Sequence, residues 1–364
     1  MKKLTKKNRD ITKFLIPLLS ILIALLIGAI LIVIQGKDPI YAYLQLFSGA
    51  FSNKGRFGET IIKTIPLIFT GLAVTFAYRC SVFNIGAEGQ FMMGALGATW
   101  FALSFKGAPH VVAIVGAFLS AFILGAIWGW IPGILKAKRG LNETINTILM
   151  NYIAIQVVSF AVKGPLRESN GQLPQTDLLE KAYSLTRFWP GTRVHTGLIL
   201  ALIMVGIVYY YIFWTSNGFR MRVVGLNSNA AEYAGIRVPL NYALALAISG
   251  GLAGLGGASE ILGIQHRLMD GFSSGFGFDG IAIALISGLH PIGVVFSAFF
   301  FGVLRTGANT MQTSVGISTS LVDIVQGLVI FFVLAALAWQ NIKSGKIKFF
   351  SKKQKSIEQK EANS

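Results

Sequence analysis

The chain has 364 residues, of which 53% are hydrophobic and only 13% are charged. Soluble domains average roughly a quarter charged residues, so this composition excludes an ordinary water-soluble enzyme, and a single cysteine excludes a disulfide framework or a cysteine-rich metal site. The net charge of +17 does not indicate nucleic-acid binding, because the basic residues cluster before the first apolar run and after the last one. Short basic segments beside membrane spans stay on the cytoplasmic side, so both ends are expected there.

The class that remains is an all-α polytopic membrane protein. A basic cytoplasmic N-terminus (1–13) and a basic cytoplasmic tail (343–364) enclose a transmembrane domain (14–342). The first apolar run is too long for the core of a signal peptide and no small-residue cleavage site follows it, so we interpret it as a retained span. About ten membrane segments are predicted from length and hydrophobicity: 14–34, 57–78, 86–104, 109–134, 144–162, 196–214, 240–262, 277–289, 292–308 and 320–340.

The charges of the loops predict how these segments are oriented. Counted from a cytoplasmic start, they place the loop 215–239 inside and the longer loop 163–195 outside. The first loop is basic and the second mixes both signs of charge, as the positive-inside rule requires. The segment 277–289 is too short to span alone and is interpreted as a half-helix. Residues 40–51 could lie along the outer membrane surface.

Two glycine-rich breaks interrupt the apolar pattern, at 83–90 before the third segment and at 275–280 before the eighth. Each break holds one carboxylate, Glu88 or Asp279, where a helix begins. By the topology above, the two breaks have opposite orientations, which suggests an inverted repeat with an interface near the membrane midplane. Each carboxylate could cap its own half-helix or line a solute pathway. Both interpretations stay open.

Other polar and small residues predict structure rather than chemistry. Arg305 and Asp323 could form an ion pair, because an unpaired charge in lipid is strongly disfavoured. The run GGLAGLGGAS at 250–259 lacks the Lys-Ser/Thr ending of a phosphate loop and is interpreted as a close helix-packing surface. Since the sequence has no nucleophile elbow and no metal-spaced His or Cys set, it predicts neither a catalytic nor a metal site.

The loop 215–239 contains the pattern of a short helix. Asn229 and Glu232 have the spacing of an N-cap and the third helical residue, and Gly235 is placed to end the helix. Such a helix could insert Tyr233 into a groove on a soluble partner. It could equally be a connector folded on the membrane face, and the residues leave both possibilities open.

Three motifs resemble those of ABC-importer permeases of the sugar and branched-chain amino acid type: RCSVFNIGAEGQ at 79–90, AAEYAGI at 230–236, and FDGIA at 278–282 followed by GLHP at 288–291. The resemblance runs from about residue 14 to residue 342 with the motifs in order. Within it, FNIGAEGQ is similar to the nucleoside branch, whose members are paired with basic membrane lipoproteins. The resemblance implies a permease subunit of a bacterial cytoplasmic membrane that imports a small-molecule solute, a nucleoside on this branch, by alternating access.

The resemblance also implies partners and roles. It implies a second permease subunit, with a heterodimer favoured over a homodimer, two ATP-binding subunits that hold ATP and Mg, and a lipid-anchored substrate-binding protein. This chain itself would contact membrane lipid, bind no cofactor and no nucleic acid, and have no enzyme activity. Coupling to the ATP-binding subunits would fall to Asn227, Ser228, Asn229, Ala230, Ala231, Glu232, Tyr233, Ala234 and Gly235. The translocation pathway would be flanked by Asn84, Gly86, Glu88, Gln90, Phe278 and Asp279. The alternative is a stand-alone secondary transporter driven by an ion gradient, or a permease for a sugar or an amino acid.

Overall fold

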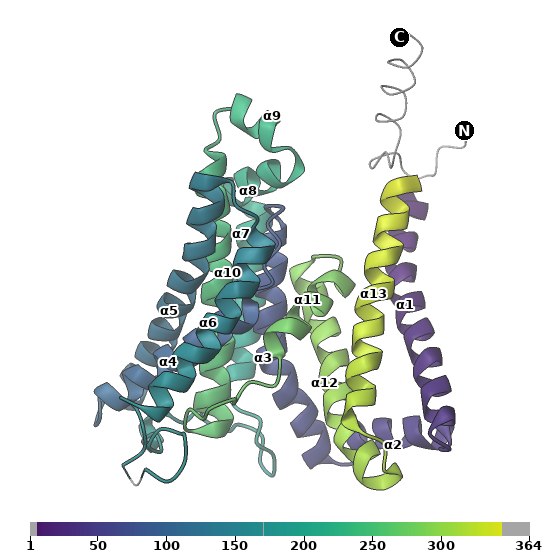
Figure 1. Ribbon diagram of the computed structural model, residues 1–364, viewed down its shortest axis with the longest axis vertical. Coiled ribbons are helices and arrows are strands. Elements are labelled where there is room, and N and C mark those ends of the chain that lie inside the picture. Colours follow the sequence, from purple (N-terminus) through teal and green to yellow (C-terminus); the bar gives the residue numbers. More distant parts are fainter. Residues whose placement is uncertain (1–5, 170, 344–364) are drawn as a thin grey trace, which may run out of the picture. The chain divides into compact units, whose positions relative to one another are not determined.

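The computed structural model describes residues 6–169 and 171–343, and most of the chain within those ranges is helical (Figure 1). The elements are α1 (Lys6–Ile34), α2 (Pro39–Phe51), α3 (Lys54–Tyr78), α4 (Ala87–Ser104), α5 (His110–Arg139), α6 (Glu143–Lys163), η1 (Lys181–Tyr183), α7 (Gly197–Trp214), α8 (Ser216–Leu226), α9 (Ser228–Tyr233), α10 (Val238–Glu260), the π-helical turn η2 (Ile261–Gln265), α11 (Phe276–Ile286), α12 (Pro291–Val315) and α13 (Thr319–Lys343). In the described ranges β pairing is limited to two isolated bridges, Gln175 with Met269 and Arg187 with His195. The predicted all-α class is confirmed.

A helix lies on each membrane segment that the sequence predicts. Among the described helices, six have both the length and the apolar composition to cross a bilayer: α3, α5, α6, α7, α10 together with η2, and α12. The half-helix predicted at 277–289 is α11, which has only 11 residues, and the surface segment predicted at 40–51 is α2. The number of crossings and the side on which the termini lie stay predictions, as does the division into 1–13, 14–342 and 343–364.

The described residues divide into two compact units, one that contains α1 and α13 and one formed by residues 38–319. In α1, Ser20, Ala24 and Gly28 recur every fourth residue on the buried face. This is the spacing at which small residues allow close helix contacts. The opposite face exposes large apolar side chains such as Leu26 and Ile30, as a lipid-facing helix does.

α10 is the central helix of the second unit and packs against α3, α4 and α5. Glycines bring the backbones together at these crossings. A Cβ added to Gly94 would lie 2.1 Å from the Cα of Gly254, and one added to Gly125 would lie 2.4 Å from the carbonyl oxygen of Gly250. Side chains do not fit at such distances, so the run 250–259 is a helix-packing surface, as predicted.

The segment between α6 and α7 folds back onto the end of α10. The backbone N–H of Leu185 donates to the carbonyl oxygen of Leu262 in η2 at 3.0 Å, and that of Thr176 donates to the carbonyl of Leu268 at 2.9 Å. These bonds tie the loop predicted at 163–195 to the chain that leads into α11. The loop is therefore part of the support for the second break.

His195 is buried in this contact and is 1% exposed. Its Nδ1 accepts the backbone N–H of Gly197 at 3.2 Å, and a Cβ added to Gly263 would lie 2.3 Å from its Nε2. Burial lowers the pKa of His195 to about 4, with smaller contributions from the charges of His266 and Arg187. The ring is therefore neutral and closely packed at pH 7.

Acidification is expected to destabilise the protein through His195. The unfolded chain protonates this histidine near its ordinary pKa of 6.5, so between pH 7 and pH 5 it takes up a proton that the native state does not. The free energy of unfolding then falls by about 2 kcal/mol, and the loss continues down to the native pKa. Thermal unfolding of the detergent-solubilised protein measures this. His195→Asn keeps an acceptor for Gly197 but does not titrate, and an equal decline in both proteins would contradict the assignment.

Candidate functional site

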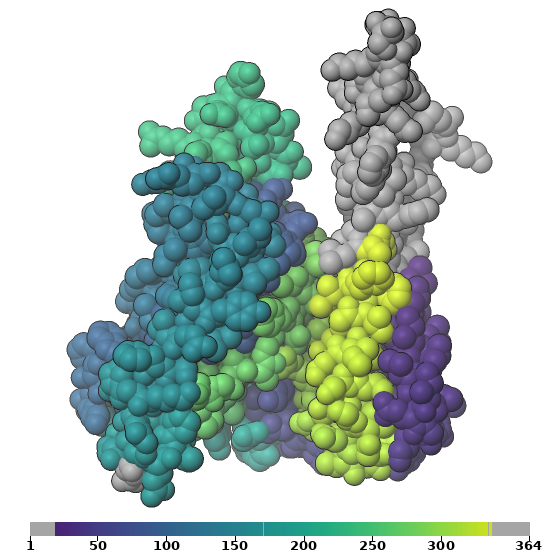
Figure 2. Space-filling view, viewed as in Figure 1, coloured from purple at the N-terminus to yellow at the C-terminus, as the bar shows by residue number. Residues whose placement is uncertain are grey.

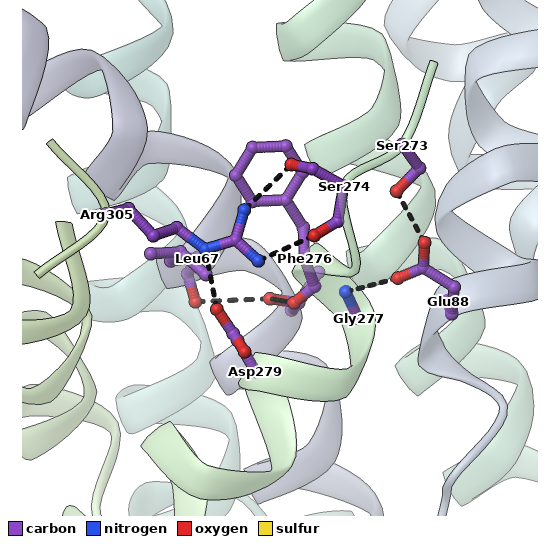
Figure 3. A network of polar contacts seen from close by, with 9 residues as sticks. Leu67, Glu88, Ser273, Ser274, Phe276, Gly277, Asp279 and Arg305 are labelled. Atoms are coloured by element: carbon purple, nitrogen blue, oxygen red, sulfur yellow. Dashed lines mark hydrogen bonds and ion pairs between the residues drawn. The ribbon is translucent and has the colours of Figure 1, made fainter. Parts of the chain in front are cut away.

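The two glycine-rich breaks meet in the folded chain. α4 starts after the first break and α11 after the second, and the two helices abut at their N-terminal ends (Figure 3). Gly277 makes this approach possible, because a Cβ there would lie 2.2 Å from the backbone nitrogen of Glu88. Both helix N-termini carry partial positive charge, so their junction favours a negative side chain.

Glu88 supplies that negative side chain. It is 4% exposed, its Oε2 accepts the backbone N–H of Gly277 at 2.6 Å, and its Oε1 accepts the hydroxyl of Ser273 at 2.5 Å. Capping was one of the two roles predicted for this carboxylate, but the sequence assigned the wrong helix. Glu88 caps α11 rather than its own helix α4, because the junction places its carboxyl group over the first turn of α11.

Asp279 lies in the first turn of α11, two residues after Gly277, and pairs with Arg305 of α12. The Nε of Arg305 donates to Oδ2 of Asp279 at 2.7 Å, while Nη1 and Nη2 donate to the side chain and the backbone carbonyl of Ser274, both at 2.8 Å. The guanidinium also lies 4.5 Å from the ring centre of Phe276. Asp279 and the loop before α11 thus accept from all three guanidinium nitrogens of Arg305, while its predicted pair with Asp323 stays a prediction.

α3 forms a wall against which α11 rests. The hydroxyl of Thr70 donates to the carbonyl oxygen of Phe276 at 2.9 Å, and a Cβ added to Gly280 would lie 2.8 Å from Thr70. A Cβ added to Gly71, the next residue of α3, would lie 2.6 Å from the side chain of Ile283. The start of α11 is thus fixed by α3, α4 and α12 together.

A second polar network fixes the first break. Asn84 is fully buried and Gln90 is 1% exposed. The Nδ2 of Asn84 donates to Oε1 of Gln90 at 2.7 Å and to the hydroxyl of Ser249 at 2.8 Å, and its Oδ1 accepts the backbone N–H of Gly86 at 2.9 Å. These amides satisfy each other and the broken backbone, which is one of the two roles the sequence left open for them.

The predicted pathway residues differ in how far their side chains are exposed to solvent. Asn84, Gly86 and Gln90 lie in the packed interior, whereas Phe278 is 47% exposed at the start of α11. Glu88 and the Asp279 carboxylate, whose side chain is 13% exposed, lie between these extremes. Their assignment to a solute route stays a prediction.

Sequence reasoning missed the support that α6 gives to the first break. Asn151 is 2% exposed, its Oδ1 accepts the backbone N–H of Gly89 at 2.8 Å, and its Nδ2 donates to the carbonyl of Ile85 at 2.9 Å. The hydroxyl of Thr147 accepts the N–H of Ile85 at 3.3 Å. An asparagine inside an apolar segment was the signal that could have revealed it, because such a residue must find a partner in the membrane.

The short helix predicted in the loop 215–239 is α9, at the upper end of the second unit (Figure 2). Its N-cap is Asn227, whose Oδ1 accepts the N–H of Ala230 at 3.1 Å, so the prediction of Asn229 as the cap was wrong by two residues. Gly235 ends the helix as predicted, with a φ of 75° and backbone bonds that close a Schellman motif. Tyr233 is 95% exposed while Ala231 is buried.

α8 joins this helix to the first break. Gly225 in the last turn of α8 lies so close to the chain after α3 that an added Cβ would be 2.3 Å from the carbonyl oxygen of Arg79. The hydroxyl of Ser81 donates to the carbonyl of Gly225 at 2.7 Å. Residues 79–81 lead directly into the first break. α8 therefore connects the predicted coupling residues of α9 to the predicted pathway residues at that break.

The all-helical fold with six long apolar helices among the described residues defines a polytopic α-helical membrane protein. The chain belongs to the family described as branched-chain amino acid transport system, permease component, whose sequence profile matches residues 57–334. The chain is 37% identical to the guanosine ABC transporter permease protein NupP of Bacillus subtilis, over 93% of this chain and 98% of the relative. It is 34% identical to the glucose ABC transporter permease protein TsgB13 of Haloferax volcanii, over 90% and 89%.

A further relative from Bacillus subtilis is the guanosine ABC transporter permease protein NupQ, which is 29% identical over 68% of this chain and 79% of the relative. One organism thus holds two guanosine permease proteins that are both similar to this chain. The similarity to NupP is higher and covers more of both sequences.

Proposed function

We propose that this chain is the permease subunit of an ATP-driven importer of nucleosides. The name of NupP, the relative that this chain matches over 98% of its length, supports a nucleoside as the solute, as does the run FNIGAEGQ that contains the first break. The observation that carries the mechanism is the contact of α8 with residues 79–81, which links an exposed helix to the break.

The proposed importer contains further subunits. A second permease is expected as a different polypeptide, because NupP and NupQ are distinct relatives of this chain in one organism. ATP-binding subunits would hold ATP and Mg, and a lipid-anchored protein would deliver the solute. The chain would cross a bacterial cytoplasmic membrane about ten times with both termini inside. α9 would then lie on the cytoplasmic side, where the ATP-binding subunits dock.

In the proposed mechanism, α9 follows the closure of the ATP-binding subunits and pulls on α8. Since α8 rests on residues 79–81, its movement shifts the first break and the start of α4. The Glu88 carboxylate and the ion pair of Asp279 with Arg305 hold the junction of α4 and α11 together. The junction can therefore move as one unit away from the second permease subunit. The chain would in this way alternate between outward and inward openings.

Tyr233→Ala tests the coupling role. The side chain is 95% exposed, so its removal costs the isolated chain little stability. Uptake of labelled guanosine by cells that co-express the second permease, the ATP-binding subunits and the lipoprotein is expected to fall about tenfold or more, which corresponds to about 1.4 kcal/mol of lost coupling. Tyr152→Ala, at another exposed tyrosine, which lies in α6 and is 65% exposed, is the matched control and keeps normal uptake.

The same assay separates the proposed importer from the alternatives. Uptake that the chain supports alone, and that an ionophore abolishes, would overturn the ATP-driven assignment in favour of an ion-gradient transporter. Competition by unlabelled glucose or an amino acid, with none by nucleosides, would replace the proposed solute while leaving the permease role in place.

A further inference from the structure

Two arginines without acidic partners lie side by side where α3, α7 and α8 meet. The guanidinium carbons of Arg79 and Arg222 lie 5.3 Å and 5.5 Å from the ring centre of Phe213. His290 stacks on the same ring at 5.6 Å between centres. The site therefore gathers two positive charges and an imidazole around one aromatic ring.

The hydrogen-bonding capacity of these arginines is incompletely used. Within the described residues, no carboxylate lies within ion-pairing distance of Arg79 or Arg222, and the Nε atoms of both are buried without a hydrogen-bond partner. Arg79 donates one bond, from Nη2 to the carbonyl of Leu289 at 2.5 Å. By contrast, Arg193 and Arg305 are each paired with a carboxylate. Two neighbouring positive charges without a counter-ion repel each other, so an anion from outside the chain would stabilise this cluster.

A pocket of about 520 Å³ opens beside the cluster. Its lining includes Phe213, Trp214, Phe219, Arg220, Arg222 and Ile236. Trp214 is 72% exposed and Phe219 is 58% exposed. The pocket thus joins basic groups on one side to exposed aromatic rings on the other.

The end of α7 indicates where this pocket lies relative to a bilayer. α7 is apolar throughout and finishes with the run YYYIFW at 209–214. Tyr and Trp concentrate at the level of lipid headgroups, where one end of the ring is apolar and the other is wet. The basic groups follow directly in α8, at the depth where phosphates of lipids are found.

We propose that this pocket binds the headgroup phosphate of an anionic phospholipid. Arg220 and Arg222 contact the phosphate, Arg79 adds positive potential behind them, and the acyl chains lie along the apolar surface of α7 past Trp214. A lipid is favoured over a soluble phosphate because the exposed rings of Trp214 and Phe219 adjoin the charges. The inference rests on the proposed function only in placing the pocket on the cytoplasmic side of the membrane.

Such a lipid would act on coupling. The pocket lining reaches from α7 and α8 to Ala234 and Ile236, which directly follow α9. A bound headgroup would therefore brace the two ends of the segment that carries α9. Transport by the assembled importer is expected to require anionic lipid for this reason.

The test is lipid binding to the delipidated full chain in mild detergent, followed by native mass spectrometry during titration with phosphatidylglycerol or phosphatidylcholine. Phosphatidylglycerol is expected to bind saturably, at least fivefold more tightly than phosphatidylcholine. Arg222→Gln should weaken this binding about fivefold or more. Arg139→Gln removes one positive charge from the exposed end of α5, outside the pocket lining, and should leave the affinity unchanged.

Four outcomes would overturn the proposal. Equal affinity for the two lipids would show that the charges are not used, and equal loss in both variants would show that only net charge matters. Full competition by glycerophosphoglycerol, the headgroup without acyl chains, would assign the pocket to a soluble phosphate. If phosphatidylglycerol fails to bind while Arg222→Gln prevents assembly with the ATP-binding subunits, the arginines serve a protein carboxylate instead. Because binding is measured on the chain alone, the result is independent of the transported solute.

Discussion

Glu88→Gln is expected to abolish most uptake while the protein still inserts into the membrane. The carboxyl group accepts hydrogen bonds from Gly277 and Ser273 with almost no exposure to solvent. A glutamine keeps an oxygen that accepts from Gly277, and its N–H₂ group can donate to the hydroxyl of Ser273, but neither bond then involves a charged acceptor. A bond to a charged group contributes about 1.5–3 kcal/mol, and the favourable interaction of the charge with two helix N-termini is lost with it.

We expect this change to reduce guanosine uptake at least tenfold and to lower the thermal stability of the purified chain. Glu180→Gln is the matched control. Its carboxylate also accepts one backbone N–H, that of Gly107 at 2.9 Å, but on an exposed surface, where the loss is small. Normal uptake by Glu88→Gln would show that the junction of α4 and α11 tolerates loss of its charge and would remove Glu88 from the mechanism.

Gly277→Ala separates the charge from the contact itself. The added Cβ would overlap the backbone of Glu88, so the helix ends are forced apart even though both hydrogen-bonding partners of the carboxyl group remain. Uptake and thermal stability should both fall. Ser273→Ala removes only the shorter side-chain bond and should have a smaller effect than either change.

The positions of the long helices could be predicted closely because hydrophobic length and glycine breaks are local properties. The break at 275–280 and the short α11 followed from an apolar run too small to span and a cluster of glycines. The end of α9 followed from Gly235 for the same reason. α8 was missed, because its polar sequence SNGFRMR gives no apolar periodicity to detect.

Pairings between distant residues could not be predicted. Glu88 and Gly277 are separated by 189 positions, and nothing in the first break identifies which helix end its carboxylate caps. For Arg305 the sequence suggested only Asp323 as a partner, and the fold alone reveals the ion pair with Asp279. The choice of Asn227 over Asn229 as N-cap depends on where the preceding helix ends, which is also a tertiary property. Local patterns located the two breaks and the short helix α9, and packing decided which contacts their residues make.

The contact between α8 and the first break leads to the second prediction with a large effect. Gly225→Val is expected to uncouple ATP hydrolysis from transport. Its Cβ would lie 2.3 Å from the carbonyl oxygen of Arg79, so α8 must move away from the break and the bond from Ser81 to Gly225 is lost. α9 remains exposed and free to dock, because Asn227 and Gly235 still fix its ends.

The measurement is uptake and ATP hydrolysis by the assembled importer in proteoliposomes with the solute-loaded binding protein. We expect Gly225→Val to assemble and to hydrolyse ATP while uptake falls about tenfold or more. Gly206→Val in α7 is the matched control, since it places the same β-branched residue in a helix where no atom lies within 4 Å of the added Cβ. Ser81→Ala should give a partial loss, because one hydrogen bond is worth about 1 kcal/mol.

The ratio of the two activities decides what the contact does. If α8 transmits motion to the break, uptake falls further than hydrolysis, because the ATP-binding subunits still close on α9 but the half-helix junction no longer follows. If Gly225 serves only to let the chain fold, both activities fall together with the amount of assembled complex, and Gly206→Val leaves all three unchanged. If Gly225→Val transports normally, the movement reaches α4 by another route, and the direct packing of α9 and α8 on α10 becomes the connection to test.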